Sequence, residues 1–226
     1  MSYESHGRHL IGNATALNAT VSKGPNEING IVTYAPYSIE DIPFGEEFLG
    51  EYLSEHRPNV TLLFHNGSIE GYPDLSAALA GINITIPVPS IHRKDEIKYS
   101  KDTSSPFLRS ATIHLLSRTA EFELFNPLFN MGIMINSLAA EATYNGELVG
   151  TITEPEFNFE VHPGADGYTT TDRIPVEVGT VGYDVIRRAL GGQLKVDAVA
   201  EVVARVGEWK GRVKYYGKGL GASVRL

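Results

Sequence analysis

The chain has 226 residues, of which 42% are hydrophobic and 20% are charged, and it contains no cysteine. This composition suits one large or two smaller globular domains and excludes a wholly disordered chain. The lack of cysteine excludes disulfides, thiolate catalysis and cysteine-based zinc sites, and a net charge of −8 with scattered Lys and Arg argues against nucleic-acid binding.

Short apolar stretches separated by turn-forming residues fill the region between residues 30 and 89. We interpret residues 31–34, 60–64 and 82–86 as β-strands, because β-branched and aromatic residues dominate them. The first half of the chain is therefore predicted to be built of short strands.

A charged stretch at residues 90–106, rich in Ser and Lys and closed by Pro, predicts an exposed connector. We place a domain boundary near Ser105. The predicted domains are residues 1–105 and residues 106–226.

The strand signals in the second half are stronger. Residues 120–124 alternate between apolar and polar side chains, Asn126-Pro127 ends that pattern, and residues 131–138 resume an apolar strand. Asn145-Gly146 follows, a pair that accepts positive φ at both central positions of a type I′ turn, so a tight hairpin is expected. Residues 157–161 alternate again before a Pro- and Gly-rich loop.

Residues 194–206 have small or apolar side chains at every second position, which predicts a long half-buried strand. A helix is the alternative, because several valines also fall at helical spacing. We prefer the strand, since β-branched residues dominate the buried set and residues 209–216 and 220–226 continue in the same manner.

A short pattern occurs once in each half, at residues 72–81 and residues 183–192. Each copy starts with Tyr, contains Ala-Leu and ends with Gly, which is typical of one or two helical turns ended by Gly. A helical turn repeated once per domain, between late strands, predicts two tandem copies of one module.

We find no pattern that carries catalysis. Gly217, Gly219 and Gly221 lack a following helix to hold a phosphate and indicate that the backbone turns or packs closely beside a neighbouring strand, and Trp209 is expected in the core. The seven histidines show no metal-binding spacing, and no nucleophile motif is present. No catalytic, cofactor-binding or metal site is therefore expected, and no enzyme.

The sequence carries five Asn-x-Ser/Thr sequons, all in the first half. They predict N-glycosylation, although chance occurrence is the alternative. There is no apolar run of membrane-spanning length and no signal peptide at Met1, so we expect any export signal to lie upstream. The candidate glycosylation sites are Asn13, Asn18, Asn59, Asn66 and Asn83.

Two groups of motifs resemble known families. Residues 125–130 (FNPLFN) and residues 144–150 (YNGELVG) resemble the water-stress type of late embryogenesis abundant domain. Residues 187–192 (RRALGG), 196–200 (VDAVA) and 216–226 (YGKGLGASVRL) resemble the C-terminal end of the fungal vacuolar membrane protein family named for termination of autophagy.

The resemblance implies two tandem immunoglobulin-like or fibronectin-like β-sandwich domains, each with a short helical turn between late strands. It also implies a position on the luminal side of the vacuole membrane, anchored by a segment absent from this chain. We expect a non-enzymatic structural or interaction module without a cofactor, whose partners are neighbouring immunoglobulin-like domains or another protein. A lipid-binding β-sandwich is the alternative, because the interior of a sandwich can open into an apolar groove. A hydrolase is the least favoured reading.

Overall fold

Strands dominate the computed structural model, which confirms the all-β class. The chain divides into two compact units: unit 1 is Met1–Phe48 with Arg57–Pro89, and unit 2 is Leu49–His56 with Ser90–Leu226. The predicted boundary at Ser105 lies outside the described residues, so the two predicted domain ranges remain predictions. The structure describes residues 2–3, 9–16, 30–34, 38–54, 56, 58–64, 74, 77, 81–88, 107–126, 128, 131–163, 168–190 and 192–226.

Unit 1 is built from short strands. A four-stranded sheet has the order β2-β1-β5-β6, and β3 pairs with β4 in a separate two-stranded sheet. Its core is formed by Ile11, Phe48 and Val60. The predicted strands at residues 31–34, 60–64 and 82–86 are confirmed as β4, β5 and β6. The strands are β1 (Ser2–Tyr3), β2 (His9–Leu10), β3 (Gly12–Ala16), β4 (Gly30–Tyr34), β5 (Asn59–Leu63) and β6 (Asn83–Pro87).

A helix that the sequence analysis missed interrupts this region. The 3-10 turn η1 (Ile39–Asp41) leads into α1 (Ile42–Leu53), which lies between β4 and β5. The Ser38 side chain begins the turn by accepting a hydrogen bond from the Asp41 backbone N–H at 3.2 Å. The helix residues through Phe48 belong to unit 1, and those from Leu49 onward belong to unit 2.

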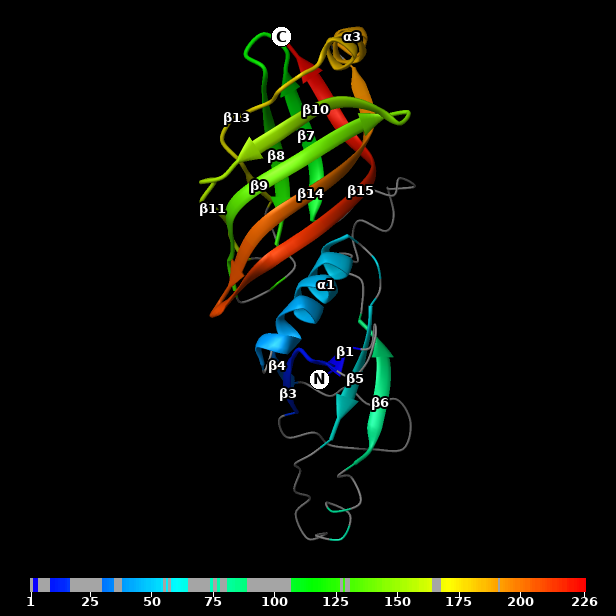
Figure 1. The fold of residues 1–226 in the computed structure, drawn as a ribbon, viewed down its shortest axis with the longest axis vertical. Helices are drawn as coiled ribbons and strands as arrows, with labels where there is room; N and C mark the ends of the chain where they lie inside the picture. Colours follow the sequence, from blue (N-terminus) through cyan, green and yellow to red (C-terminus); the bar gives the residue numbers. More distant parts are fainter. Residues whose placement is uncertain are drawn as a thin grey trace. The chain divides into compact units, whose positions relative to one another are not determined.

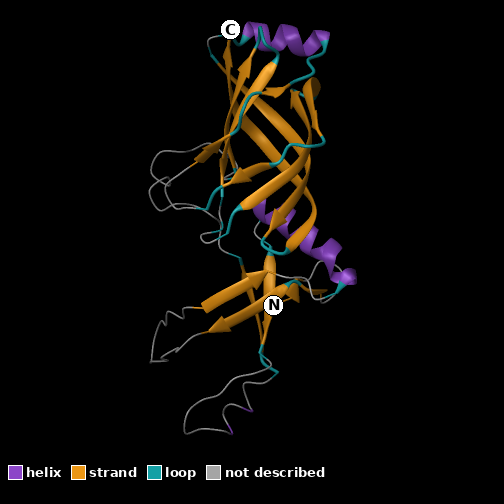
Figure 2. Cartoon of the chain, turned by 90° about the vertical axis from the view of Figure 1, so that its left-hand side faces the viewer, coloured by secondary structure: helices purple, strands orange, loops and turns teal. Residues whose placement is uncertain are grey.

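Unit 2 is one nine-stranded sheet that bends round on itself (Figures 1 and 2). Its main order is β10-β9-β14-β15-β7-β8-β12, with β11 paired to β9 and β13 paired to β8. Thr151 and Glu177 exchange two backbone hydrogen bonds of 2.9 Å, which join β10 to the segment after β13. The strands are β7 (Leu108–His114), β8 (Thr119–Phe125), β9 (Ile133–Tyr144), β10 (Glu147–Glu154), β11 (Phe159–Val161), β12 (Tyr168–Thr170), β13 (Ile174–Pro175), β14 (Gln193–Val206) and β15 (Trp209–Arg225).

The two strongest local predictions in unit 2 are confirmed. Asn145 and Gly146 have φ values of 51° and 82°, as a type I′ hairpin between β9 and β10 requires. Residues 194–206 form β14, not a helix, and its alternate side chains Leu194, Val196 and Val202 are buried.

The predicted backbone role of the glycines near the C-terminus is confirmed for Gly219. They lie inside β15, where Gly219 has a φ of +64° and donates its N–H to the Asp197 carboxylate at 2.8 Å. The β14–β15 register shifts between Val196 and Ala198, so this is a β-bulge. The core position expected for Trp209 is also confirmed, because its side chain is buried.

The predicted helical turn before β14 is confirmed as α3 (Thr180–Arg188), which lies between β13 and β14. It begins at Thr180, ahead of the predicted start. Its N-cap residue is Gly179, so no side chain caps the first turn. The other copy of the pattern, residues 72–81, lies outside the described residues apart from Asp74, Ala77 and Gly81. The tandem repeat therefore remains a prediction.

The end of β8 has a clear physical cause. Asn126 is buried, and its amide nitrogen donates to the Met131 carbonyl at 2.7 Å and to the Val161 carbonyl at 2.9 Å. Its side-chain oxygen accepts from the Leu128 N–H at 2.8 Å. Because one side chain satisfies three backbone groups of different segments, the strand stops at Phe125, as the Asn-Pro motif predicts.

Candidate functional site

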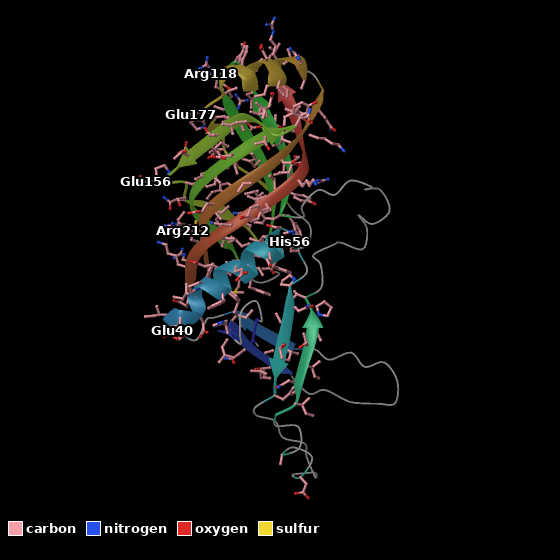
Figure 3. The ribbon with its side chains drawn as sticks, turned by 45° about the vertical axis from the view of Figure 1, so that its right-hand side comes forward. Glu40, His56, Arg118, Glu156, Glu177 and Arg212 are labelled. Carbon is pink, nitrogen blue, oxygen red and sulfur yellow. The ribbon has the colours of Figure 1, made fainter. Side chains whose placement is uncertain are left out.

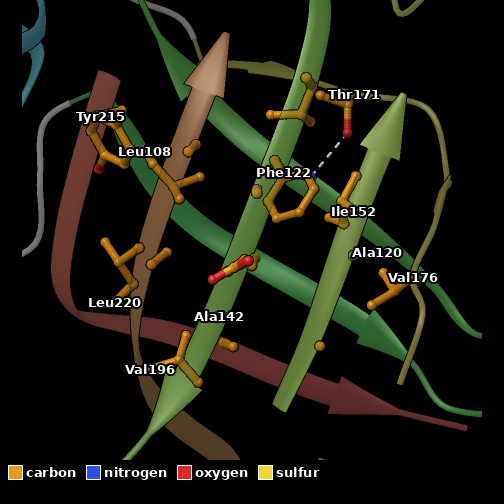
Figure 4. Close-up of a pocket in the computed structure, with 18 of the residues that line it drawn as sticks. Leu108, Ala120, Phe122, Ala142, Ile152, Thr171, Val176, Val196, Tyr215 and Leu220 are labelled. Carbon is orange, nitrogen blue, oxygen red and sulfur yellow. Dashed lines mark hydrogen bonds between the residues drawn. The ribbon is translucent and has the colours of Figure 1, made fainter. Parts of the chain in front are cut away.

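The interior of unit 2 contains a cavity of about 140 Å³ (Figure 4). Strands from both ends of the sheet line it. Leu108 of β7 and Phe122 of β8 line it from one end, and β9, β10, β14 and β15 contribute further apolar side chains. The cavity therefore lies inside the bent sheet, where a filled hydrophobic core would otherwise be expected.

Four alanines on two neighbouring strands leave this space open. In the β9–β14 ladder, Ala142 is paired with Ala198 and Ala140 with Ala200. All four side chains line the cavity and are only partly buried. Bulkier side chains at these positions would project into the same volume, so the cavity follows from residue size as well as from the bend of the sheet.

Two helices contribute to the cavity wall. Ile186 of α3 is 1% exposed and Leu53, the last residue of α1, is 2% exposed. The segment after α3 contacts the C-terminal end of β15, where the Val224 N–H donates to the Gly192 carbonyl at 3.3 Å. The end of α1 contacts the middle of β15, where the Tyr216 N–H donates to the Ser54 hydroxyl oxygen at 2.9 Å.

The cavity wall is apolar apart from Glu141, Thr171 and the hydroxyl of Tyr215. Thr171 accepts a hydrogen bond from the Phe122 N–H at 3.0 Å, so its hydroxyl oxygen is already used by the sheet, and Glu141 is exposed. Such a wall can bind an apolar group by removing it from water, and it presents no acid–base pair to a substrate.

The titratable groups with shifted pKa values lie elsewhere. Glu121 lies 3.3 Å from the His114 Nε2 and 3.1 Å from the Arg173 Nε, and these neighbours, His114 first, lower the pKa of its carboxyl group. A hydrogen bond from the Ser38 hydroxyl is the main cause of the lowered pKa of Asp41. Burial raises the pKa of Tyr52. Neither these three groups nor the partners named for them form part of the cavity wall.

Metal-binding clusters of three or more His, Asp or Glu side chains are absent from the described residues. The expectations that the chain binds no metal and no cofactor, and that it is no enzyme, remain predictions.

Three of the five candidate glycosylation sites fall on described residues, and all three are exposed. Asn13 lies in β3 opposite Thr33, while Asn59 and Asn83 begin β5 and β6. Asn18 and Asn66 lie outside the described residues. Glycosylation at all five positions remains a prediction.

The sequence analysis did not identify the cavity. It recognised Ala198 and Ala200 as part of an alternating inward face, but it gave no special meaning to their size. The available signal was the pair of small residues in the middle of a buried face, matched by Ala140 and Ala142 in the preceding long strand.

Within the part of the chain that the structure describes, every helix is too short or too polar to cross a membrane.

A comparison with protein-family models matches residues 100–214 to the description "Tag1-like fifth LEA-2 like domain". The match covers half of the chain and includes β7 through β14 of unit 2, so it supports the resemblance to late embryogenesis abundant domains that the Asn-Pro and Asn-Gly motifs indicated. A search of curated proteins found no match. On the family-model match, the chain belongs to the family of Tag1-like fifth LEA-2 like domains.

Proposed function

We propose that unit 2 is a non-enzymatic binding module that holds one alkyl chain, such as the acyl chain of a lipid, in its interior. The observation that carries this proposal is the apolar cavity of about 140 Å³ inside the closed sheet. Apolar cavities of similar size remain dry in water and accept small hydrocarbons such as benzene.

The expected affinity comes from burial alone. Each methylene group transferred from water into an apolar interior contributes about 0.8 kcal/mol. The cavity has room for part of one chain, and Glu141, the charged residue in its wall, is acidic and exposed, so the head of such a ligand would stay outside the sheet. Specificity would therefore concern chain length more than headgroup chemistry.

We further propose that the module lies on the luminal side of a fungal vacuolar membrane protein that acts in the termination of autophagy. Membership of the Tag1-like family, the C-terminal motifs and the exposed sequons Asn13, Asn59 and Asn83 support this location. Its membrane anchor would lie outside this chain, and its protein partners would be neighbouring immunoglobulin-like domains or another protein. Vacuolar co-fractionation of the tagged protein and a glycosidase-sensitive mobility shift would test the location.

Alkyl-chain binding is tested by a matched pair of substitutions in β9. Ala140 faces the cavity, whereas its neighbour Ala139 faces outward and is exposed. In Ala140→Phe the ring should occupy the cavity and reduce binding of a fluorescent fatty acid to the full chain by roughly tenfold or more, the loss expected when several methylene groups are excluded. Ala139→Phe should bind as the unmodified chain does.

Circular dichroism and thermal unfolding would show that both variants are folded. Extraction of the purified chain followed by mass spectrometry should recover a lipid from the unmodified protein and from Ala139→Phe, and less from Ala140→Phe. Equal probe binding by a folded Ala140→Phe would refute the assignment of the cavity as the binding site.

A further inference from the structure

Three segments meet at one end of unit 2. The turn Leu115–Arg118 between β7 and β8 is joined to the end of β15 by a hydrogen bond from the Leu115 N–H to the Arg225 carbonyl, at 2.9 Å. On its other side the end of β15 is joined to the segment after α3 through Val224 and Gly192. Figure 1 shows α3, the C-terminal end of β15 and the β7–β8 turn together, and we call this region the α3 end.

The α3 end is basic in a chain whose net charge is −8. Exposed arginines occur in all three segments, and the exposed acidic residues of this end include Glu177 and, on α3, Asp184. Within the described residues, no ion pair is found for these arginines. Figure 3 shows Arg118 and Glu177 at this end of the sheet and Arg212 nearer the other end. The four arginines are Arg118, Arg187, Arg188 and Arg225.

Large apolar side chains are also exposed at the α3 end. Leu116 in the β7–β8 turn is 77% exposed, Leu190 just after α3 is 40% exposed, and Tyr183 on α3 is 39% exposed. Leu116 and Leu190 lie on opposite sides of the end of β15, so they flank the basic residues instead of forming one groove.

We propose that the α3 end docks on the surface of a lipid bilayer that carries anionic headgroups. Arginine binds phosphate oxygens through two parallel hydrogen bonds, and exposed leucine side chains gain free energy by entering the acyl region beneath the headgroups. Charge complementarity favours an anionic surface, and separate apolar residues on both sides of β15 suit a plane. Docking does not require an occupied cavity. It does place α3, whose Ile186 lines the cavity, next to a source of alkyl chains, and this last step rests on the proposed function.

Vesicle flotation with the full chain tests the docking. The probe is a set of vesicles of phosphatidylcholine alone and of phosphatidylcholine mixed with phosphatidylserine. The chain should bind the mixed vesicles more tightly, and Arg187→Glu with Arg188→Glu should weaken that binding by roughly tenfold or more, since each basic residue near an anionic surface contributes several-fold. Leu116→Ser with Leu190→Ser should weaken binding to the same vesicles.

The matched control is Lys210→Glu with Arg212→Glu, the same charge change at exposed positions of β15 away from the α3 end. It should keep vesicle binding. Because acidic residues in the last turn oppose the helix dipole, Arg187→Gln with Arg188→Gln provides a milder variant that should also bind less.

The docking proposal is overturned if both double Arg variants bind the mixed vesicles as tightly as the unmodified chain does. It is also overturned if the β15 control loses as much binding as the Arg187→Glu with Arg188→Glu variant. Binding of the unmodified chain to neither vesicle also overturns it and favours a protein partner for this end. Ala140→Phe separates the two proposals: it should lose the internal alkyl chain and still float with anionic vesicles.

Discussion

In unit 2, a glycine holds both α3 and the last part of α1, from Leu49 onward, against the sheet, with a different effect in each case. In α3, a Cβ atom at Gly182 would collide with the Val149 carbonyl oxygen of β10. In α1, a Cβ atom at Gly50 would lie 2.5 Å from the Lys214 carbonyl oxygen of β15. Glycine inside a helix is less favourable than alanine by about 1 kcal/mol, so each helix accepts this cost to bring its backbone against a strand.

The difference lies in what each helix covers. The segment Leu49–Ser54 lies beside the part of β15 that has no partner strand on that side, because β7 pairs only with Ala222–Arg225. It therefore covers an edge that would otherwise expose unpaired amides. Helix α3 packs its Ile186 into the core cluster with Val149 and Leu194. One helix mainly protects a strand edge, and the other mainly completes a core.

Gly182→Ala should have the largest effect. The added methyl group meets a backbone carbonyl oxygen that cannot rotate away, so α3 must move off β10 and Ile186 must leave its packed position. We expect a loss of about 3 kcal/mol in the free energy of unfolding, at the upper end of overpacking effects. Urea denaturation would measure it.

Gly179→Ala, one residue before α3, is the control for this change. A Cβ atom there has open space around it, so the loss should be well below that of Gly182→Ala. If the two variants proved equally stable, α3 would not be held against β10 as described.

Gly50→Ala should change the free energy of unfolding by less, and whether stability rises or falls tests the close packing of α1 on β15. Without the contact to Lys214, the substitution would stabilise the helix by about 1 kcal/mol. With the contact at 2.5 Å, we expect a net loss of about 1–2 kcal/mol as α1 shifts from β15. Denaturation with urea would distinguish the two cases, and a gain in stability would contradict the close packing of α1 on β15.

Local chemistry explains which parts of this fold could be read from the sequence. The Asn145-Gly146 turn and the alternation along β14 depend on neighbouring residues, and both were predicted correctly. Helix α1 was missed because Pro43, Gly45 and Gly50 are typical of loops. In the structure Pro43 falls in the first turn, where its missing N–H is tolerated, and Gly50 serves a contact with a strand far away in the sequence.

The cavity depends on still longer-range information. It requires the register that sets Ala140 opposite Ala200 and Ala142 opposite Ala198, and it requires the Thr151–Glu177 pairing that joins the sheet to itself. Neither follows from side-chain period alone, because a strand pattern fixes which face is buried and not which residues of another strand lie beside it. The all-β class could therefore be predicted, but the candidate site could not.

Ser54→Ala should have the smallest effect and isolates the edge-covering role of α1. The Ser54 side chain is buried, and its hydroxyl oxygen accepts from the Tyr216 N–H at 2.9 Å. Removing one such hydrogen bond costs about 1 kcal/mol. Because the change leaves the Gly50 contact intact, unfolding by urea should show a small loss of stability.

Hydrogen exchange separates this local effect from a global one. In Ser54→Ala the Tyr216 amide should exchange faster, while amides in the β9–β10 hairpin, which α1 does not cover, should lose protection only by the amount that the global stability falls. Ser54→Thr keeps the hydroxyl oxygen and should retain the protection of Tyr216. An unchanged exchange rate of the Tyr216 amide in Ser54→Ala would show that neighbouring strand contacts protect this edge. Helix α1 would then serve only to pack Leu53 into the cavity wall.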